Sequence, residues 1–523
     1  MANNNERSSL MSVIASSSVG TLIEWYDFYI FGSLATIIAA KFFPAGNDTA
    51  ALLSTLATFA AGFIVRPFGA LFFGRLGDLI GRKYTFLVTL VLMGGATFLI
   101  GCIPDYATIG WFAPIAILIL RLLQGLALGG EYGGAATYVA EHAPAGERGY
   151  WTSWIQTTAT LGLFVSLMVI IFTKESLGAE KFEDWGWRLP FLLSILLVIV
   201  SIIIRMRMKE SPMFAKLKDE GKVSTNPLKE SFGNKANFKM VLLVLFGATM
   251  GQGVVWYTGQ FYAQLFLLNT CKVDATQVNT WLCVALLLGT GGFVLFGWLS
   301  DKIGRKVIMM LGMALAVVCT KPLFQRMFAY ASPAHKTEIT EKATSEVKMS
   351  LAPKLTTADS LKVTKTVKFY TDGTTVTDTK KETIFADTAS AAAKAFKQPS
   401  PAKVVKLGES NKWPIIWSIV CLVVFVTMVY GPIAAFLVEL FPTKIRYTSM
   451  SLPYHIGNGV FGGLVPLIAT LMFEATKLNP ATPSGDPFAG LAYPMTIAML
   501  CLLIGTLVLP KNVNHMDDNQ EGS

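Results

Sequence analysis

GRLGDLIGRK, residues 74–83, returns later in the chain as GWLSDKIGRK, residues 297–306. Seven of the ten positions match at identical spacing, and each copy follows the second apolar stretch of its half of the chain. Self-similarity of this kind indicates a duplicated structural unit. We therefore expect two related six-helix halves, an arrangement in which one half rocks against the other around a central site.

The composition of the chain is that of a membrane protein. Hydrophobic residues make up 53% of the 523 residues and charged residues 15%, and the mean hydropathy is +0.51. A soluble domain has about 25% charged residues. Apolar stretches of about 20 residues, enough to cross roughly 30 Å of hydrocarbon as a helix, recur throughout. The sequence predicts an all-α membrane protein with about twelve transmembrane helices in two six-helix pseudo-repeats, and a water-soluble enzyme is not expected.

The formal charge of +10 is distributed as membrane topology requires, so we expect no nucleic-acid partner. Lysine and arginine accumulate on cytoplasmic loops, and here they gather on alternate loops such as 205–209 and 302–306. The opposite loop 174–184 carries more acids than bases. We expect a multi-pass protein of the bacterial inner (plasma) membrane with both termini in the cytoplasm. Residues 1–10 show no cleavable signal pattern, so the first helix should direct insertion.

Two hydrophilic segments set the expected domain boundaries. Residues 1–208 should form an N-terminal six-helix bundle, 209–237 a cytoplasmic linker, and 238–523 a C-terminal six-helix bundle. Residues 331–412 should form a small extracytoplasmic insertion between helices 9 and 10, because long translocated loops escape the charge rule. Alternating polar and apolar residues around Asp372-Gly373 predict a β-hairpin within it.

The repeated stretch has the chemistry of a gate. Its glycines allow two helix ends to approach closely, and its acid can face a helix N-terminus or a basic side chain in one state of the protein. A turn with positive-inside charges would explain the basic residues alone. It would not explain an acid and two glycines in register twice. The expected gating residues are Gly74, Asp78, Gly81 and Arg82 in the first copy and Gly297, Asp301, Gly304 and Arg305 in the second.

The six cysteines are scattered singly and show neither metal-ligand spacing nor a disulfide framework. We interpret them as small buried hydrophobes. The sequence also lacks a nucleophile–base pair, a metal cluster and a phosphate-binding loop. We therefore expect no enzyme activity, no metal and no cofactor other than a coupling proton.

Five further segments stand out beside the repeated motif: EWYDFY (24–29), RPFG (66–69), GGEYGG (129–134), WGWRLP (185–190) and FPTKIRY (441–447). The repeated motif resembles the signature of the major facilitator superfamily, and these segments resemble its metabolite:proton symporter family. That family includes carriers of 2-oxoglutarate, shikimate, citrate, and proline or betaine. The resemblance covers nearly all of the chain except the insertion, and the fifth apolar stretch lacks the Gly-Pro-rich motif of the proton–drug antiporters.

Ionisable side chains inside the apolar stretches are the first candidate site residues, because each costs at least about 2.5 kcal/mol in mid-bilayer. Arg121 and Gln124 share one face of the fourth stretch with Glu131, and they resemble the Arg-x-x-Gln-Gly motif, whose arginine is implicated in proton transfer. Glu24 and Asp27 share a face of the first stretch, so one of them should hold a proton or pair with an arginine.

Arg66 in the second stretch needs a partner from another helix or from a substrate. We expect Asp27, Glu131, Glu24 and Arg121 to couple protons, and Arg66, Arg121 and Gln124 to bind substrate. The alternative is a fixed ion-pair network that holds helices together.

Polar and aromatic side chains extend the expected substrate site. Trp256 and Gln260 lie on one stripe of the seventh stretch with Tyr257 beside it, and Tyr454 and Asn458 share a side of the eleventh. Such groups shape a solute pocket by hydrogen bonds and stacking, or they make interhelical bonds instead. Tyr26, within the first-stretch motif, completes the expected set.

The resemblance and the buried charges together favour a secondary active transporter. We expect proton-coupled uptake of a small carboxylate-bearing metabolite or zwitterion by alternating access, with the protein functional as a monomer in the lipid bilayer. The alternatives are a uniporter or osmolyte carrier, and a nutrient receptor that binds solute without net transport.

Overall fold

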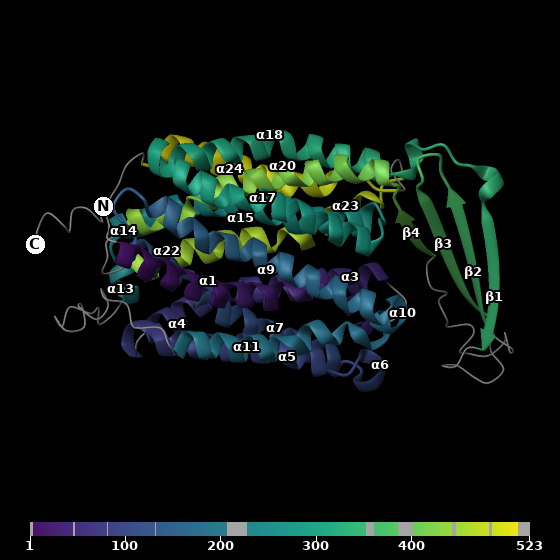
Figure 1. The fold of residues 1–523 in the computed structure, drawn as a ribbon, viewed down its shortest axis with the longest axis horizontal. Helices are drawn as coiled ribbons and strands as arrows, with labels where there is room; N and C mark the ends of the chain where they lie inside the picture. The colour runs from purple at the N-terminus through teal and green to yellow at the C-terminus, as the bar shows by residue number, and fades with distance from the viewer. Residues whose placement is uncertain are drawn as a thin grey trace, which may run out of the picture.

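A computed structural model describes residues 4–44, 48–80, 82–130, 132–206, 227–351, 360–384, 401–441, 446–480 and 484–510. Long helices run roughly parallel to one another, and a β-sheet lies beyond one end of them (Figure 1). We call this end the sheet end. The opposite end, where α1 begins and α24 finishes, is the terminal end.

The helices of the N-terminal half pass back and forth between the two ends. They are α1 (Asn4–Ser33), α2 (Ala35–Phe42), α3 (Asp48–Ile64), α4 (Arg66–Ile80), α5 (Arg82–Cys102), α6 (Tyr106–Ile109), α7 (Phe112–Gly129), α8 (Tyr132–His142), α9 (Arg148–Leu177), α10 (Ala179–Lys181) and α11 (Arg188–Met206).

The C-terminal half repeats this pattern with more irregular helices. It contains α13 (Pro227–Phe232), α14 (Lys235–Val244), α15 (Met250–Trp256), α16 (Ala263–Leu265), α17 (Ala275–Ile303), α18 (Arg305–Ala331), α20 (Lys412–Tyr430), α21 (Ile433–Leu440), α22 (Arg446–Tyr454), α23 (Val465–Thr476) and α24 (Ala492–Val508). π-helical segments join several of them, at Leu245–Thr249, Tyr257–Tyr262, Phe266–Thr270 and His455–Gly462.

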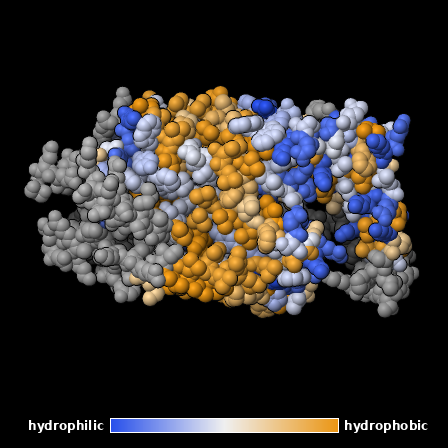
Figure 2. All heavy atoms as spheres, in the orientation of Figure 1, coloured by the Kyte–Doolittle hydropathy of each residue, from blue (hydrophilic) through white to orange (hydrophobic). Residues whose placement is uncertain are grey.

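The expected number of membrane crossings is confirmed within the described ranges. Nine helical spans there are long and apolar enough to cross a membrane, two further spans are bent by 60° and 62°, and the shorter apolar helix Leu87–Cys102 supplies the last. Figure 2 shows a matching band of hydrophobic surface across the middle of the face that it draws. The fold is therefore an all-α membrane protein of about twelve spans in two six-helix pseudo-repeats.

The segment between α18 and α20 contains the expected β-structure. Strands β1 (Thr344–Leu351), β2 (Ser360–Phe369), β3 (Thr375–Ile384) and β4 (Ala402–Lys406) form one antiparallel sheet in the order β1-β2-β3-β4. The hairpin predicted around Asp372-Gly373 is confirmed, because β2 pairs with β3 across this turn, where Gly373 has a φ of 81°. The sheet stands opposite the terminal end (Figure 1).

Candidate functional site

Arg66 lies at the centre of the bundle, where α4 starts after the break that follows α3. Its side chain is 1% exposed. The guanidinium carbon stands 4.1 Å from the ring centre of Phe63, 4.6 Å from that of Phe28 and 5.2 Å from that of Trp25. Cation–π attraction partly offsets the loss of water around a buried guanidinium.

The hydrogen-bonding capacity of Arg66 is not filled by its neighbours. Within the described ranges, its Nε and one terminal nitrogen, Nη2, have no hydrogen-bond acceptor. The guanidinium interacts electrostatically with the phenol groups of Tyr257, Tyr29, Tyr454 and Tyr430. Among the described residues no carboxylate forms an ion pair with Arg66, and a buried cation without such a partner is unfavourable. An anionic ligand would supply the missing charge and hydrogen-bond acceptors.

Stacked aromatic rings form a wall beside Arg66, and both halves contribute to it. Tyr29 of α1 stacks on Trp25 at 5.1 Å and on Trp256 of α15 at 5.3 Å. Tyr257 follows in the π-helical segment and packs edge-on against Phe63 at 5.1 Å. π-helical turns often mark functional sites because they redirect side chains, and here one follows Trp256 in the helix that faces α1.

Tyr454 is the hub of a polar cluster on the other side of Arg66. Its hydroxyl lies 2.6 Å from that of Tyr430 and accepts a hydrogen bond of 3.0 Å from Asn458. Its ring stacks at 3.6 Å on Tyr132 of the N-terminal half, and the Tyr132 hydroxyl accepts a hydrogen bond from Gln156. The predicted proximity of Tyr454 and Asn458 is thus confirmed, and the cluster joins the two halves.

Sequence reasoning missed three residues of this region. Tyr29, Tyr132 and Tyr430 are fully or almost fully buried. A signal was present for two of them: Tyr29 ends the EWYDFY segment and Tyr132 lies in the GGEYGG segment. Tyr430 stands at the end of an apolar helix, where nothing in the sequence distinguishes it from a packing residue.

Gln260 makes a contact between the halves. Its side chain and the hydroxyl of Thr160 on α9 lie 3.1 to 3.2 Å apart and exchange hydrogen bonds. The amide of Gln264, one turn further, donates to Asn279 of α17 at 2.9 Å. Gln260 therefore sits at the interface of the halves, whereas Gln264 holds two helices of one half together.

Arg121 lies deeper in the N-terminal half than Arg66. Its guanidinium donates a hydrogen bond of 2.6 Å to Gln124, and Gln124 donates one of 2.6 Å to Thr97 of α5. The guanidinium carbon is 4.0 Å from the ring centre of Phe28. Because Arg66 also stacks on Phe28, this ring connects the two buried arginines.

The acidic candidates lie away from the aromatic wall or outside the described residues. Asp27 is 1% exposed, and within the described ranges neither of its oxygens accepts a hydrogen bond. It faces Gly94 of α5, and the neighbouring Ser194 hydroxyl of α11 donates instead to a backbone carbonyl. Tyr26 donates to the carbonyl of Pro190 at 2.9 Å. Glu24 is buried, and Glu131 lies outside the described residues.

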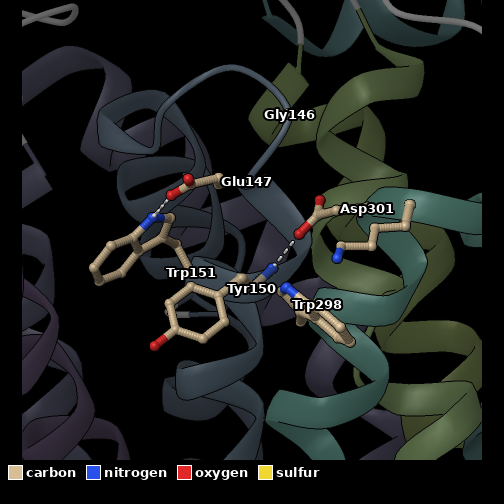
Figure 3. A pocket seen from close by; sticks show the side chains of 7 residues that line it. Gly146, Glu147, Tyr150, Trp151, Trp298 and Asp301 are labelled. Carbon is tan, nitrogen blue, oxygen red and sulfur yellow. Dashed lines mark hydrogen bonds between the residues drawn. The ribbon is translucent and has the colours of Figure 1, made fainter. Parts of the chain in front are cut away.

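The second copy of the repeated motif joins the two halves at the terminal end. The Asp301 carboxylate accepts hydrogen bonds of 2.8 Å from the backbone N–H groups of Gly149 and Tyr150, in the first turn of α9. Figure 3 draws the bond from Tyr150. Arg305 bonds to Asp301 and forms an ion pair of 3.0 Å with Glu439 of α21. This is the arrangement that the sequence predicted for the acid: it faces a helix N-terminus and a basic side chain.

The glycines of this second copy allow that close approach. A Cβ at Gly297 would lie 2.5 Å from the Ser153 side chain and 2.6 Å from the carbonyl oxygen of Gly149. Gly304 has a φ of 100°, which favours glycine, and separates α17 from α18. In the first copy, Gly74 lies within α4, whereas Gly81 and the side chains of Asp78 and Arg82 lie outside the described residues.

A second ion pair crosses the same end of the molecule. Arg446 at the start of α22 lies 3.4 Å from Glu141 of α8, and both side chains are buried. A cavity of about 590 Å³ opens beside the Asp301 contact, lined by Tyr150 and Trp151 of one half and Trp298 and Lys302 of the other (Figure 3). The terminal end is thus closed by two charged contacts between the halves.

A helical bundle of two similar halves, with a buried arginine and charged contacts between the halves, is the arrangement expected of transporters that rock around a central site. The model of the "Sugar (and other) transporter" family matches residues 13–242. The chain is 35% identical over 335 residues to the alpha-ketoglutarate permease of Escherichia coli K12, which covers 64% of this chain and 75% of that protein.

Other relatives and solved structures agree with this match. The chain is 33% identical to the proline/betaine transporter of Escherichia coli K12, over 60% of this chain and 64% of that protein. It is 29% identical to the citrate-proton symporter of Salmonella typhi, over 62% of this chain and 73% of that protein. The solved proton:xylose symporter XylE superposes with a TM-score of 0.63 at 16% identity, covering 98% of this chain and 99% of that one. The chain belongs to the major facilitator superfamily, in its metabolite:proton symporter family.

Proposed function

We propose that the protein is a secondary active transporter that imports a small carboxylate-bearing metabolite or zwitterion together with a proton. The observation that carries this proposal is Arg66. It is buried between the halves, it has unused hydrogen-bond donors, and an aromatic wall lies beside it. Guanidinium is suited to a carboxylate because its planar donors bind both oxygens at once.

The names of the relatives support the same class of solute. The alpha-ketoglutarate permease and the citrate-proton symporter are named for carboxylates, and the proline/betaine transporter is named for zwitterions. A carboxylate is the group that these solutes share. It would bind Arg66, while the rest of the solute would contact Trp256, Tyr257 and the Tyr454 cluster.

The remaining candidate residues take roles around this anchor. Asp27 is the proposed proton site, because a carboxylate that is only 1% exposed is costly to keep charged. Arg121, which donates a hydrogen bond to Gln124, is the proposed partner of the proton site. It would respond to the charge on Arg66, because both guanidinium groups stack on the ring of Phe28. Glu24 and Glu131 are the next proton-site candidates. Solute and proton would then favour each other's binding, and this linkage is reciprocal.

Transport requires that the contacts at the terminal end break and re-form. In our proposal this end faces the cytoplasm of a bacterial cell, and Asp301, Arg305, Gly297 and Gly304 form its gate together with the first motif copy. Solute enters from the sheet end while these contacts are closed. Binding of solute and proton shifts the balance toward the opposite state through differential affinity.

The test is uptake by the purified protein in proteoliposomes under an imposed pH gradient, with a panel of carboxylates and betaines. The proposal requires accumulation of at least one of these solutes that an uncoupler abolishes. Uptake that ignores the uncoupler, or that responds to osmolality instead, would identify a uniporter or osmolyte carrier. Saturable binding without accumulation would identify a receptor.

A further inference from the structure

The four-stranded sheet carries a strong positive charge that nothing in the transport path explains. Its strands contain eight lysines and three acids, a net charge of +5, whereas the whole chain has a net charge of +10. Half of the excess charge of the protein is therefore concentrated in one small element. An excess of one sign in one element produces a field that extends beyond its own surface.

Most of the lysines form no direct ion pair within the described residues. Lys348, Lys368 and Lys380 form ion pairs with acids at 3.2, 3.1 and 2.5 Å. Five others take part in no ion pair within the described part of the chain. These are Lys362, Lys365, Lys381, Lys403 and Lys406.

The sheet is fixed to the C-terminal half at its β4 edge. The backbone of Val405 exchanges hydrogen bonds with the loop before α17, from Asp274 at 2.9 Å and to Lys272 at 2.8 Å. The side chain of Gln277 on α17 bonds to both the N–H and the carbonyl of Leu407, at 2.8 and 2.9 Å. These paired bonds fix the orientation of the sheet relative to α17.

Asp372 forms a second attachment at the β2–β3 turn. It accepts hydrogen bonds from Lys336 at 2.7 Å, from Asn411 at 2.8 Å, and from the N–H and hydroxyl of Thr374 at 2.9 Å. Partial burial acts to raise the pKa of Asp372, but the donated hydrogen bonds outweigh it and hold the pKa well below its usual range. The turn is thereby tied to the loops after α18 and before α20.

The position of the sheet places its charge in front of the transport path. Its strands run across the sheet end of the bundle, at a steep angle to the helices (Figure 1), and hydrophilic surface gathers there (Figure 2). The N-terminal half contributes more acids than lysines in the loop at this end, Glu175, Glu180, Glu183 and Asp184 against Lys174 and Lys181. This loop is therefore net negative, and the sheet adds its excess of positive charge on the side where solute would enter.

We propose that the sheet is an electrostatic collector, which raises the concentration of anionic solutes at the entrance before they reach Arg66. This inference rests on the proposed function and specifies the solute further, as a net anion rather than a zwitterion. Clustered charge of one sign raises local ligand concentration and association rates. The field reaches about 30 Å at 0.01 M salt and about 8 Å at 0.15 M.

The test compares a net anion with a zwitterion in right-side-out proteoliposomes at about 10 mM and about 150 mM ionic strength. The probes are 2-oxoglutarate and glycine betaine. In the lysine variant Lys362, Lys365, Lys381, Lys403 and Lys406 are all replaced by Gln. We expect its KM for 2-oxoglutarate to rise by about threefold to tenfold at low salt, with unchanged kcat and no effect at high salt.

A matched variant of opposite sign provides the control. Glu346→Gln, Asp378→Asn and Glu382→Gln together make the sheet more positive, so the KM for 2-oxoglutarate at low salt should fall. All of these side chains lie in the sheet, outside the helical bundle, and glycine betaine uptake should not respond to either variant.

Three results would overturn the collector. One is a KM for 2-oxoglutarate that ignores both variants at low salt while uptake itself proceeds, which leaves the proposed function standing. Another is an equal fall of kcat for both solutes in the lysine variant, which would make the sheet a lid over the acidic N-terminal half. The third is transport of zwitterions alone, or of no solute. In that case the protein carries no anion whose concentration the sheet could raise.

Discussion

Asp301 on α17 and Gly149 on α9 meet at a distance of 2.8 Å, so that a carboxylate from one half caps a helix of the other. Free backbone N–H groups at the first turn of a helix carry partial positive charge, which a carboxylate stabilises. In the proposed transport cycle this contact breaks when the terminal end opens. Its strength would then add to the stability of the closed state relative to the open one.

Replacing Asp301 should weaken this closure. Asp301→Asn keeps the size of the side chain but removes the charge that interacts with α9 and with Arg305. We expect a loss of about 0.3–2 kcal/mol in the stability of the closed end, and slower net transport with nearly normal solute binding. Pulsed electron paramagnetic resonance between spin labels at Ala145→Cys and Ile303→Cys should show a larger open population. Asp78→Asn should act in the same direction, and normal transport in both variants would exclude the gating role.

Gly297 offers a second way to disturb the same contact, with a control in the same helix. Gly297→Ala places a methyl group 2.5 Å from the Ser153 side chain, whereas nothing lies within 4 Å of a Cβ at Gly291. The first variant should force the helices apart at a cost of about 1–3 kcal/mol, and labels at the terminal end should move apart. Gly291→Ala should leave the distances unchanged. Equal behaviour of the two variants would contradict the close packing of α9 and α17.

Arg66→Lys tests the anion anchor. A lysine keeps the charge but replaces a planar fork of donors by a single point charge. We expect solute affinity to fall by about tenfold to a hundredfold, the loss of roughly 1.5–3 kcal/mol for a charged hydrogen bond, while uptake still responds to the pH gradient. Arg326→Lys, at an exposed position of α18, is the matched control and should bind normally. Unchanged affinity in Arg66→Lys would move the anchor to Arg121.

Asp27→Asn tests proton coupling. The amide imitates the protonated acid, so the variant should exchange solute across the membrane without concentrating it. Counterflow of labelled solute measures the exchange, and accumulation under a pH gradient measures the coupling. Asp184→Asn, at a side chain that is 79% exposed, should retain both. If Asp27→Asn still accumulates solute with normal proton stoichiometry, the coupling role belongs to Glu131 or Glu24.

The orientation of the protein is tested by labelling the sheet. Thr374 is buried and hydrogen-bonded, so it is unsuitable as a labelling position, whereas Met349 on β1 is 60% exposed. Met349→Cys should react with an impermeant thiol reagent in intact spheroplasts, and Ala145→Cys at the terminal end only after lysis. Cys102 is exposed and must first be replaced by Ser. The reverse pattern would invert the topology.

The fold was predictable because its signals are local or repeated. The length of each apolar stretch predicts one membrane crossing, and the repeated motif indicates the two halves. The breaks were not predictable: the 60° bend after Ser33 and the π-helical segment Tyr257–Tyr262 interrupt helices whose apolar pattern continues through them. Hydropathy reports which side chains avoid water, but it does not report the local winding of the backbone.

Only those site residues whose burial costs much free energy could be predicted from the sequence. Arg66 and Arg121 were identified because a cation in the middle of a bilayer costs free energy, so that such a residue is expected to have a function. The sequence predicted that Glu24 or Asp27 holds a proton or pairs with an arginine. Within the described residues Asp27 forms no ion pair with an arginine, and its oxygens face α5 and α11. The stack of Tyr132 on Tyr454 depends on how the two halves meet, and no pattern within one helix contains that information.

The double attachment of the sheet has a mechanical consequence. Val405 on β4 and Asp372 in the β2–β3 turn fix the sheet to the C-terminal half, while β1 lies farthest from the helices (Figure 1). A small rotation of that half must therefore become a larger sweep at β1, as at the tip of a lever arm. A fluorophore on β1 paired with one on the N-terminal half would convert each turnover of the protein into an optical signal.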